Sequence, residues 1–342
     1  MWRERRRRAH ERRRRSTESG ARVAEHSVSG AAMREASGVA MPGAAGDWGV
    51  SGLSVRYGRH PALVDVTLAV PGGAITAVVG SDGSGKTTLA RALAGALKPS
   101  AGSVRRPASR RIGYVSAAAG VYRDLTVDEN LEFTGGAYGL RGPALRQRTA
   151  QLLARIGLTD AHDRLAGDLS GGMRQKLAFA MAVLHEPELL ILDEPTTGVD
   201  PVSRAELWRL IARAAAAGTG VLFATSYLDE AERARMVLVL DRGHELVSGD
   251  PIDIVATLPG AVFTVPIVRR RDGGSIERHA AAEPGAAEAV LDGRSAPHRW
   301  RRGADWRVWS PSGAPPAGGT AARVDLSDAV IVAALQARET AA

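Results

Sequence analysis

A glycine-rich segment, GSDGSGKTT at residues 80–88, carries the strongest chemical signal in this sequence. It fits the pattern G-x-x-x-x-G-K-[ST] and stands between an apolar stretch, AITAVVG, and a segment with helical periodicity, as that pattern requires. Glycines allow a tight turn whose backbone N–H groups point at phosphate oxygens, with a helix N-terminus behind them. The alternative is a glycine-rich turn that binds nothing. We predict phosphate binding by the residues of this loop: Gly80, Ser81, Asp82, Gly83, Ser84, Gly85, Lys86, Thr87 and Thr88.

Four polar side chains predict how a nucleoside triphosphate would be held and attacked. Lys86 would neutralise the β- and γ-phosphates, and the hydroxyl of Thr87 would ligate Mg²⁺. A second apolar stretch ends in the carboxylates Asp193 and Glu194. Asp193 is suited to the Mg²⁺ shell, and Glu194 to polarising the water that attacks the γ-phosphate. By itself an Asp-Glu pair could be a solvated turn at the end of a strand. We predict Lys86 and Glu194 as catalytic residues, and Thr87 and Asp193 as metal ligands.

A third motif, LSGGMRQK at residues 169–176, begins another helical pattern. Ser170 offers a hydroxyl, and Gly171 and Gly172 expose backbone N–H groups at the expected start of a helix, which is an anion-binding arrangement. The motif alone could equally be an ordinary helix N-cap.

The elements around these motifs alternate between strand-like and helix-like patterns. AITAVVG, ELLILDEP, GVLFATS and MVLVLD are expected to be buried strands, and SRAELWRLIARAAAAG an amphipathic helix. VSGLSVRYG and LVDVTLAV, which precede the loop, have the alternation of half-buried strands. Strands that alternate with helices predict an α/β domain with a mostly parallel sheet.

Bulk composition excludes several classes of protein. The chain has 342 residues, of which 44% are hydrophobic, so a sizeable core is expected. It contains no cysteine, which excludes disulfides and thiolate metal sites. No apolar run approaches the ~20 residues that span a bilayer. The net charge is +8, but residues 1–46 hold 11 Arg and 5 Glu, which leaves only +2 for the rest. Nucleic acid is therefore not expected as a partner.

We predict three regions from these patterns. Residues 1–46 are expected to form a disordered Arg-rich tail, with a polybasic lipid- or nucleic-acid-binding segment as the alternative. Residues 47–255 are expected to form the catalytic domain, with a helical subdomain at about residues 121–186. Residues 256–342 are expected to form a small accessory region, in which RWRRGADWRVW predicts an amphipathic hairpin.

The three motifs, taken in their order along the chain, resemble those of the nucleotide-binding subunits of ATP-binding cassette (ABC) transporters. The resemblance covers residues 50–255 and includes GVDP at 198–201. It implies ATP and Mg²⁺ as cofactors and a P-loop NTPase fold of the ABC type. That fold has a mixed, mostly parallel sheet core, an antiparallel strand subdomain and a helical subdomain, to which this chain adds a small C-terminal appendage.

The resemblance also implies roles for individual residues. Tyr57 corresponds to an aromatic residue that stacks on adenine, although a strand tyrosine packed on the sheet is the alternative. In the family two such domains face each other and enclose each ATP between one P-loop and the partner's LSGG segment. Ser170, Gly171 and Gly172 would therefore serve the partner's nucleotide, and Asp200 would lie in the loop that links the two sites.

Two positions depart from the family pattern. The histidine that senses the γ-phosphate in the family is replaced by Ser226 in LFATSYLDEAE, and no histidine lies between His185 and His244. The glutamine that helps to ligate Mg²⁺ is replaced by Ala117, and the chain has no glutamine before Gln147. Serine is shorter than histidine, and alanine offers no ligand. We therefore predict that ATP binds while turnover at this site is slow.

DLTVDENL, GVDPVSR and YLDEAER are most similar to the drug- and antibiotic-exporter branch, and within it to the first ATPase half of tandem exporter ATPases. This implies ATP-driven export of a small, drug-like or lipophilic molecule. The implied partners are an integral membrane permease and a second ABC ATPase domain, identical or different. The implied location is peripheral, at the cytoplasmic face of the cell membrane. The alternatives are a non-hydrolysing, ATP-sensing regulatory subunit and a soluble ABC protein that acts on ribosomes or DNA.

Overall fold

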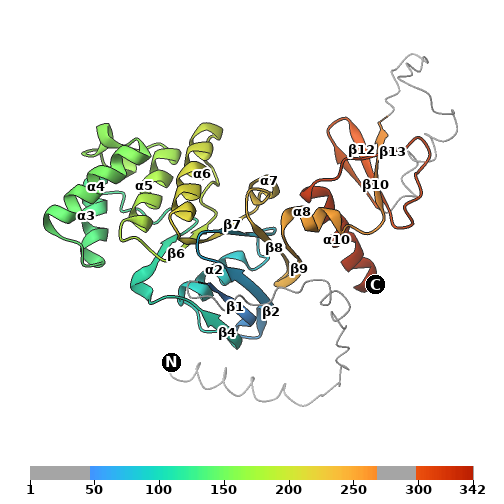
Figure 1. Cartoon of the computed structure of the whole chain (residues 1–342), viewed down its shortest axis with the longest axis horizontal. Coiled ribbons are helices and arrows are strands. Elements are labelled where there is room, and N and C mark those ends of the chain that lie inside the picture. Colours follow the sequence, from blue (N-terminus) through green and yellow to red (C-terminus); the bar gives the residue numbers. More distant parts are fainter. Residues whose placement is uncertain (1–46, 268–297, 342) are drawn as a thin grey trace, which may run out of the picture. The chain divides into compact units, whose positions relative to one another are not determined.

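The computed structural model describes residues 47–267 and 298–341, and Figure 1 shows their arrangement. The Arg-rich segment 1–46, which we predicted to be disordered, lies outside the described residues. Residues 268–297 of the predicted C-terminal region lie outside them as well. The division into three regions stays a prediction.

A six-stranded sheet with the order β5-β6-β7-β3-β8-β9 carries the motifs. Its strands are β3 (Ile75–Val79), β5 (Ile112–Val115), β6 (Leu189–Asp193), β7 (Gly220–Thr225), β8 (Met236–Asp241) and β9 (His244–Gly249). All pairings are parallel except that of β8 with β9, which confirms the predicted mostly parallel sheet. Carboxyl ends of parallel strands share one edge, so the segments after β3, β6 and β7 meet there.

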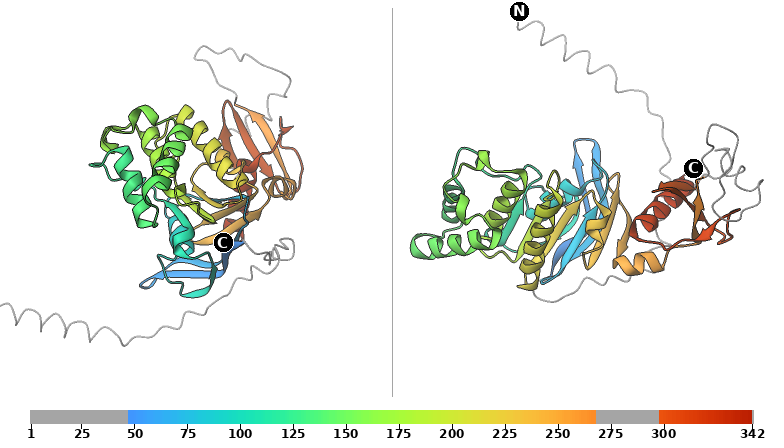
Figure 2. Two further views of the ribbon diagram at one scale, coloured as in Figure 1. Left: turned by 60° about the vertical axis from the view of Figure 1, so that its left-hand side comes forward. Right: turned by 90° about the horizontal axis from the view of Figure 1, so that it is seen from above.

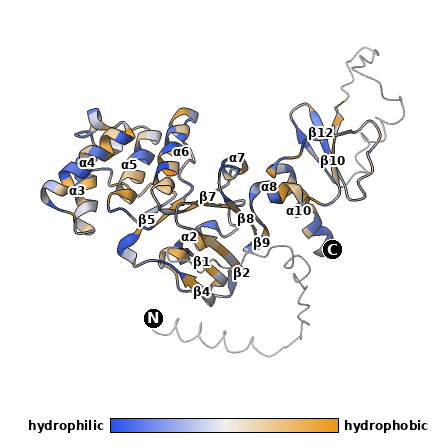
Figure 3. Ribbon diagram, viewed as in Figure 1, coloured by the Kyte–Doolittle hydropathy of each residue, from blue (hydrophilic) through white to orange (hydrophobic). Residues whose placement is uncertain are grey.

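Strands β6 and β7 are buried along their whole length, as expected for a sheet that is covered on both faces. Alternate residues of β6 belong to different apolar clusters: Leu190 and Leu192 pack with α5 and α6, whereas Leu189 and Ile191 pack with α2. The helices concerned are α2 (Lys86–Ala94), α5 (Gly171–Val183) and α6 (Pro201–Ala216). This two-sided burial holds the strand ends, and therefore the site, in fixed positions. Figure 3 shows the hydrophobic character of the central strands β7 and β8.

A separate antiparallel sheet has the order β2-β1-β4. Its strands are β1 (Trp48–Tyr57), β2 (His60–Val70) and β4 (Ala101–Arg105). In the sequence, β1 and β2 come before the P-loop segment at residues 80–88, and β4 comes after it. Leu53 and Leu63, both fully buried, join the apolar cluster of α2 and β6. The predicted antiparallel strand subdomain is thereby confirmed, and it brings Tyr57 to the end of β1.

Helices dominate the stretch between β5 and β6, and Figure 2 shows them in green beside α5 and α6. Besides α5 they are α3 (Val127–Ala137) and α4 (Gly142–Ile156), with short 3-10 turns at Thr159–Ala161 and Ala166–Asp168. Another 3-10 turn, Ser109–Arg111, directly precedes β5. Helix α3 begins with a capping box: Glu129 N–H donates to Thr126 Oγ1 at 3.1 Å, and Thr126 N–H donates to Glu129 Oε2 at 2.7 Å. Helix α4 ends at Ile156 and is capped by Gly157, whose φ of 69° favours glycine.

The C-terminal residues form a four-stranded antiparallel sheet with the order β11-β12-β10-β13 and a helix. The elements are α8 (Pro251–Ala256), β10 (Ala261–Pro266), β11 (Arg299–Arg302), β12 (Asp305–Ser310), β13 (Thr320–Ala321) and α10 (Leu326–Ala341). Strands β11 and β12 pair directly, so the predicted hairpin is confirmed. Within the described ranges, no helix combines the length and apolarity that crossing a bilayer requires.

Helix α10 is tied to both neighbouring parts of the chain. Asp328, which is fully buried, accepts a hydrogen bond from Trp300 Nε1 at 3.2 Å and one from Arg302 at 3.0 Å. On its other side, Leu326 and Ala329 join the apolar cluster that contains Ala77 and Val79 of β3. The same helix therefore bonds to the small sheet and packs into the apolar cluster that covers the β3 side of the six-stranded sheet.

Candidate functional site

The P-loop runs from the end of β3 to the first residue of α2, as the sequence predicts. Gly83 and Gly85 have φ angles of 78° and 112°, which lie in the region where a side chain is strained. Gly80 has no room for a side chain, because a Cβ there would lie 2.3 Å from Ser84 Oγ and 2.4 Å from Leu240 O. These glycines therefore shape a tight turn at the N-terminus of α2, where unpaired N–H groups and the helix dipole favour an anion.

Lys86, the first residue of α2, is 6% exposed and points back over the loop. Its ammonium donates to Gly80 O at 2.7 Å and to Ser81 O at 3.2 Å. It also donates to Ser226 Oγ at 3.1 Å and lies 3.2 Å from Glu194 Oε1. The structure thus brings the predicted residues Lys86 and Glu194 together with Ser226, the serine that departs from the family pattern. An incoming phosphate would compete with Glu194 for the lysine.

Thr87 and Asp193 also meet, across the edge of the sheet. Thr87 Oγ1 donates to Asp193 Oδ1 at 3.1 Å, and the Tyr114 hydroxyl donates to Asp193 Oδ2 at 3.4 Å. Burial raises the pKa of Asp193, and the hydrogen bond from Thr87 opposes that rise. Burial and the nearby Asp193 carboxylate raise the pKa of Tyr114 to about 12. A hydroxyl beside a carboxylate fits Mg²⁺, which is usually held by one or two carboxylates together with substrate phosphates.

Glu194 stands in a left-handed backbone conformation with φ of 53°. Its carboxylate accepts hydrogen bonds from Ser226 Oγ at 2.7 Å and from Thr197 Oγ1 at 2.8 Å. Burial opposes ionisation of Glu194, but these two hydrogen bonds and the Lys86 ammonium outweigh it and lower its pKa. The side chain is therefore held as an anion. The contacts of Ser226 and Thr197 with Glu194 were not predicted. Ser226 follows β7 and Glu194 follows β6, so the pairing of these two strands brings them together, whereas Thr197 lies in the same turn as Glu194.

A buried carboxylate, Glu230, supports this arrangement and was also missed. It is 1% exposed and lies in the short helix α7 (Leu228–Ala231) after β7. Its Oε2 accepts from Thr225 Oγ1 at 2.6 Å and from Thr196 Oγ1 at 2.9 Å. These two threonines directly precede Ser226 and Thr197, so Glu230 ties together the two segments that hold Glu194. The sequence signal was only an acidic residue just after a buried strand, which does not distinguish a buried carboxylate from a solvated one.

Comparison with known proteins agrees with this geometry. The family model described as ABC transporter matches residues 63–197. The daunorubicin/doxorubicin resistance ATP-binding protein DrrA of Streptomyces peucetius is 36% identical over 246 residues, which are 69% of this chain and 74% of that protein. The chain belongs to the ATP-binding proteins of ABC transporters. The probable multidrug ABC transporter ATP-binding protein YbhF of Escherichia coli (strain K12) is 39% identical over 258 residues, 72% of this chain, but the match spans only 44% of YbhF.

Solved structures of ABC proteins share the fold. One ATP-binding subunit of an ABC transporter is 30% identical, with a TM-score of 0.55, and the match covers 61% of this chain and 92% of that one. CbiO1 from Clostridium perfringens, part of the ABC transporter complex cbiONQ, is 27% identical, with the same TM-score of 0.55, and the match covers 61% and 90% of the two chains. The predicted ABC-type fold and the predicted resemblance to exporter ATP-binding proteins are confirmed.

The remaining predicted ABC residues lie on other elements. Ser170 is the N-cap of α5 and accepts from Met173 N at 3.2 Å. Asp200 is the N-cap of α6, and its Oδ1 accepts from Val202 N and Ser203 N at 3.1 and 3.0 Å, bonds that lower its pKa. Gly172 packs so closely that a Cβ would lie 2.4 Å from Ser203 Oγ. The LSGG segment and Asp200 therefore share one packed corner between α5 and α6.

Tyr57 and Ala117 lie on exposed segments. Tyr57, at the end of β1, is 48% exposed, which leaves its ring accessible to a flat ligand. Ala117 is exposed in the turn after β5, at the carboxyl edge of the sheet where the family's glutamine would stand. Two residues further on, Ala119 has φ of 65° and its N–H donates to Ser116 O at 2.8 Å. The turn after β5 therefore carries only small side chains at residues 116–119.

Proposed function

We propose that this chain is the ATP-binding subunit of an exporter for a small, drug-like or lipophilic molecule. The observation that carries the proposal is the convergence of Lys86, Thr87, Asp193 and Glu194 at the carboxyl edge of one sheet. These groups supply phosphate neutralisation, two metal ligands and a general base, which are the parts of phosphoryl transfer to water. The names of DrrA and YbhF, which refer to drug resistance and to a multidrug transporter, support export over other uses of ATP.

The roles proposed for the residues follow from their positions. ATP would place its phosphates on the N–H groups of residues 80–88, and Tyr57 would stack on adenine. Bound Mg²⁺ would neutralise charge on the β- and γ-phosphates, with Thr87 and Asp193 among its ligands. Glu194, an anion in this structure, would orient the attacking water and take up its proton.

We propose further that hydrolysis at this site is slow. Ser226 has its hydroxyl engaged by Lys86 and Glu194, and the exposed Ala117 carries no ligand. Two groups that stabilise developing charge in the family are thus absent, and each such donor is typically worth on the order of 10²–10³ in rate. The LSGG segment, with Ser170, Gly171 and Gly172 at the start of α5, would serve a partner's ATP. The chain would then form the slow half of an asymmetric pair.

The proposed partners are a second ABC ATPase domain and an integral membrane permease, with this chain at the cytoplasmic face of the membrane. An exposed aromatic pair supports docking by the helical part of the chain. Tyr122 and Phe133 are 48% and 55% exposed, and their rings meet edge to face with centroids 4.8 Å apart. Exposed aromatic side chains are typical of protein interfaces, so this pair is a suitable contact for a permease segment.

Two measurements on the purified chain test the proposal. Binding of a fluorescent ATP analogue should be saturable and Mg²⁺-dependent, and Lys86→Ala should weaken it while exposed Arg209→Ala should not. The double variant Ala117→Gln/Ser226→His should raise turnover, on the order of 10² or more, because it restores two preorganised groups. If the wild type turned over ATP as fast as the double variant, the proposal that hydrolysis at this site is slow would be wrong. Failure of the analogue to bind would refute the proposed function itself.

In the assembled complex, the paired variants separate the two sites. Glu194→Gln in this chain should leave most ATP turnover intact, whereas the same change in the partner domain should abolish it. If Glu194→Gln abolishes turnover while the partner's variant does not, the proposed asymmetry is wrong. If the assembled complex binds ATP without any turnover, the chain is a regulatory, ATP-sensing subunit instead.

A further inference from the structure

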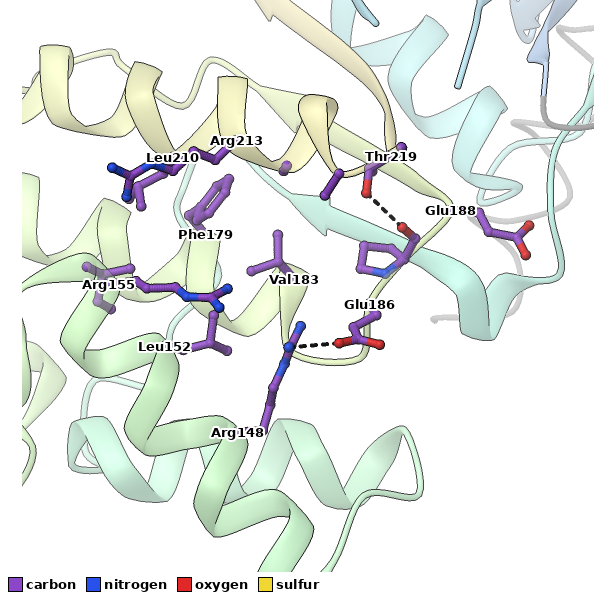
Figure 4. Close-up of a pocket in the computed structure, with 15 residues that line it drawn as sticks. Arg148, Leu152, Arg155, Phe179, Val183, Glu186, Glu188, Leu210, Arg213 and Thr219 are labelled. Carbon is purple, nitrogen blue, oxygen red and sulfur yellow. Dashed lines mark hydrogen bonds and ion pairs between the residues drawn. The ribbon is translucent and has the colours of Figure 1, made fainter. Parts of the chain in front are cut away.

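A second pocket lies away from the P-loop, between α4, α5 and α6, and Figure 4 shows its lining. It has a volume of about 580 Å³. Its back is formed by the segment 186–188, which leads into β6, and by residues 217–219 before β7. The pocket therefore sits beside the amino ends of β6 and β7, whereas the nucleotide site is at their carboxyl ends. Nothing in the proposed ATPase chemistry uses it.

The floor of this pocket is apolar, because each of the three helices turns hydrophobic side chains toward it. Leu152 of α4, Phe179 of α5 and Leu210 of α6 line it and are buried. Ile156 and Val183 extend the same lining. Pairs such as Phe179 and Val183, four residues apart, share one face of their helix. A volume between about 300 and 1,000 Å³ with a mainly apolar lining is typical of sites for small molecules.

Arginines surround this floor. Arg148 and Arg155 flank Leu152 on one face of α4, and Arg213 lies one turn after Leu210 on α6. Figure 4 shows the side chains of Arg148 and Arg155 both extending toward Phe179 and Val183 of α5. Arg148 pairs with Glu186 at 2.7 Å. Among the residues that the structure describes, neither Arg155 nor Arg213 contacts a carboxylate.

The one other acidic residue of the lining does not neutralise these cations. Glu188 pairs with Arg111, at 2.7 Å, and Arg111 is outside the pocket. Within the described parts of the chain, the guanidinium groups of Arg155 and Arg213 thus have no carboxylate partner, and both stand beside an apolar surface of small-molecule size. A guanidinium presents planar pairs of N–H donors that match a carboxylate, and its attraction for an anion is stronger beside a surface that excludes water.

We propose that this pocket binds a small amphiphilic anion, a carboxylate carried on an acyl or aromatic body. The apolar body would cover Leu152, Phe179 and Leu210, and the carboxylate would face Arg155 and Arg213. Such a ligand contacts α4 of the helical part together with α6, which follows the Glu194 segment. The proposal does not depend on the function of the P-loop.

The test uses decanoate and decylammonium, which share one chain and differ in the sign of their charge. We expect saturable binding of decanoate to the full-length protein in isothermal titration calorimetry, and much weaker binding of decylammonium. Arg155→Ala/Arg213→Ala should weaken decanoate binding about tenfold or more, since each charge-assisted contact is worth a large part of the affinity. Arg146→Ala/Arg209→Ala, on the same two helices but outside the pocket, should leave binding unchanged.

A charge reversal and a nucleotide control complete the test. In the variant Arg155→Glu/Arg213→Glu, decylammonium should bind better than decanoate, because the charge at these two positions beside the apolar floor is then negative. Saturating MgATP should not displace decanoate. The proposal is overturned if decanoate and decylammonium bind the wild type alike, if Arg155→Ala/Arg213→Ala has no effect, or if MgATP competes. It is also overturned if an acidic peptide displaces decanoate at lower concentration than other carboxylates do, because the groove would then be a protein-docking site.

Discussion

The Glu230 contact network leads to a sharp prediction about stability. Glu230→Gln keeps the size of the side chain but replaces one carboxylate oxygen by an NH₂ group. The carboxylate accepts from Thr225 and Thr196 at Oε2, and its Oε1 faces Trp208 Nε1 at 3.5 Å and Arg204 Nε at 3.8 Å. Every one of these neighbours can donate. If the glutamine amide keeps its oxygen toward the two threonine hydroxyls, its NH₂ group must face Trp208 Nε1 and Arg204 Nε, which are also donors.

The expected cost follows from these contacts. Hydrogen bonds to a charged group contribute about 1.5–3 kcal/mol, against about 0.5–1.5 kcal/mol for neutral ones, so weakening the two threonine bonds costs ~2 kcal/mol. A buried NH₂ group that faces only other donors has no acceptor, and this raises the loss of stability by up to about 1–3 kcal/mol. Rotation of the threonine hydroxyls relieves part of this, and we expect a loss of about 2–4 kcal/mol. That corresponds to a Tm lower by about 4–16 °C for a domain of this size.

Differential scanning calorimetry of the full chain measures this change. The matched control is Glu232→Gln, an exposed glutamate two residues further on, which should alter the free energy of unfolding by less than about 0.5 kcal/mol. Glu230→Gln with the same Tm as Glu232→Gln would show that the buried carboxylate does not hold Thr196 and Thr225 together. In that case Glu230 would not position the two segments that hold Glu194.

Three further predictions test local features of the fold. Gly172→Ala should destabilise the protein by about 1–3 kcal/mol, because the added Cβ would overlap Ser203. The matched change Gly136→Ala in α3, where nothing lies within reach of a Cβ, should stabilise the protein by about 0.5–1 kcal/mol. Denaturant titrations measure both changes. Thr126→Ala should cost about 1 kcal/mol through loss of the capping box, measured in the same way, and equal stability would contradict the capping role. Burial lowers the pKa of His185 below its ordinary value of 6.5, so the unfolded state takes up a proton more readily and the protein loses stability as the pH falls below about 6.5. His185→Gln should flatten that loss in denaturant titrations at a series of pH values, and an unchanged pH dependence would contradict the role of His185.

The sequence was sufficient for the parts of the structure that depend on local patterns. The P-loop is recognisable because tight turns need glycine, and Lys86 and Thr87 follow it at a fixed place in the helix. Strands β3, β6 and β7 are recognisable because both of their faces are buried, which leaves continuous apolar runs in the sequence. Parallel pairing then brings Asp193 and Glu194 to the same edge as the P-loop. The signal in each case lies within about ten residues.

Features that depend on contacts over long sequence separations were not predictable. Glu230 differs from Glu232 only in the side of a short turn that it occupies, yet one is buried among threonines and the other is exposed. Arg155 and Arg213 come from helices far apart in sequence, and only the packing of α4 and α6 around α5 places them on one pocket. The short strands β4 and β9 also lack an apolar signal, since β4 is exposed at four of its five positions and β9 has no buried one.

Ser226 shows how the structure changes the meaning of a substitution. The sequence suggests only a missing imidazole, but the serine hydroxyl accepts from Lys86 and donates to Glu194. It therefore completes a closed set of contacts in which the lysine and the glutamate neutralise each other. A γ-phosphate bound at Lys86 would take the cation away from Glu194 and bring a second negative charge close to that carboxylate. Phosphate binding at Lys86 would thus be coupled to the charge state of Glu194 through their direct contact at 3.2 Å, and Ser226 bridges the same two side chains instead of merely leaving a gap.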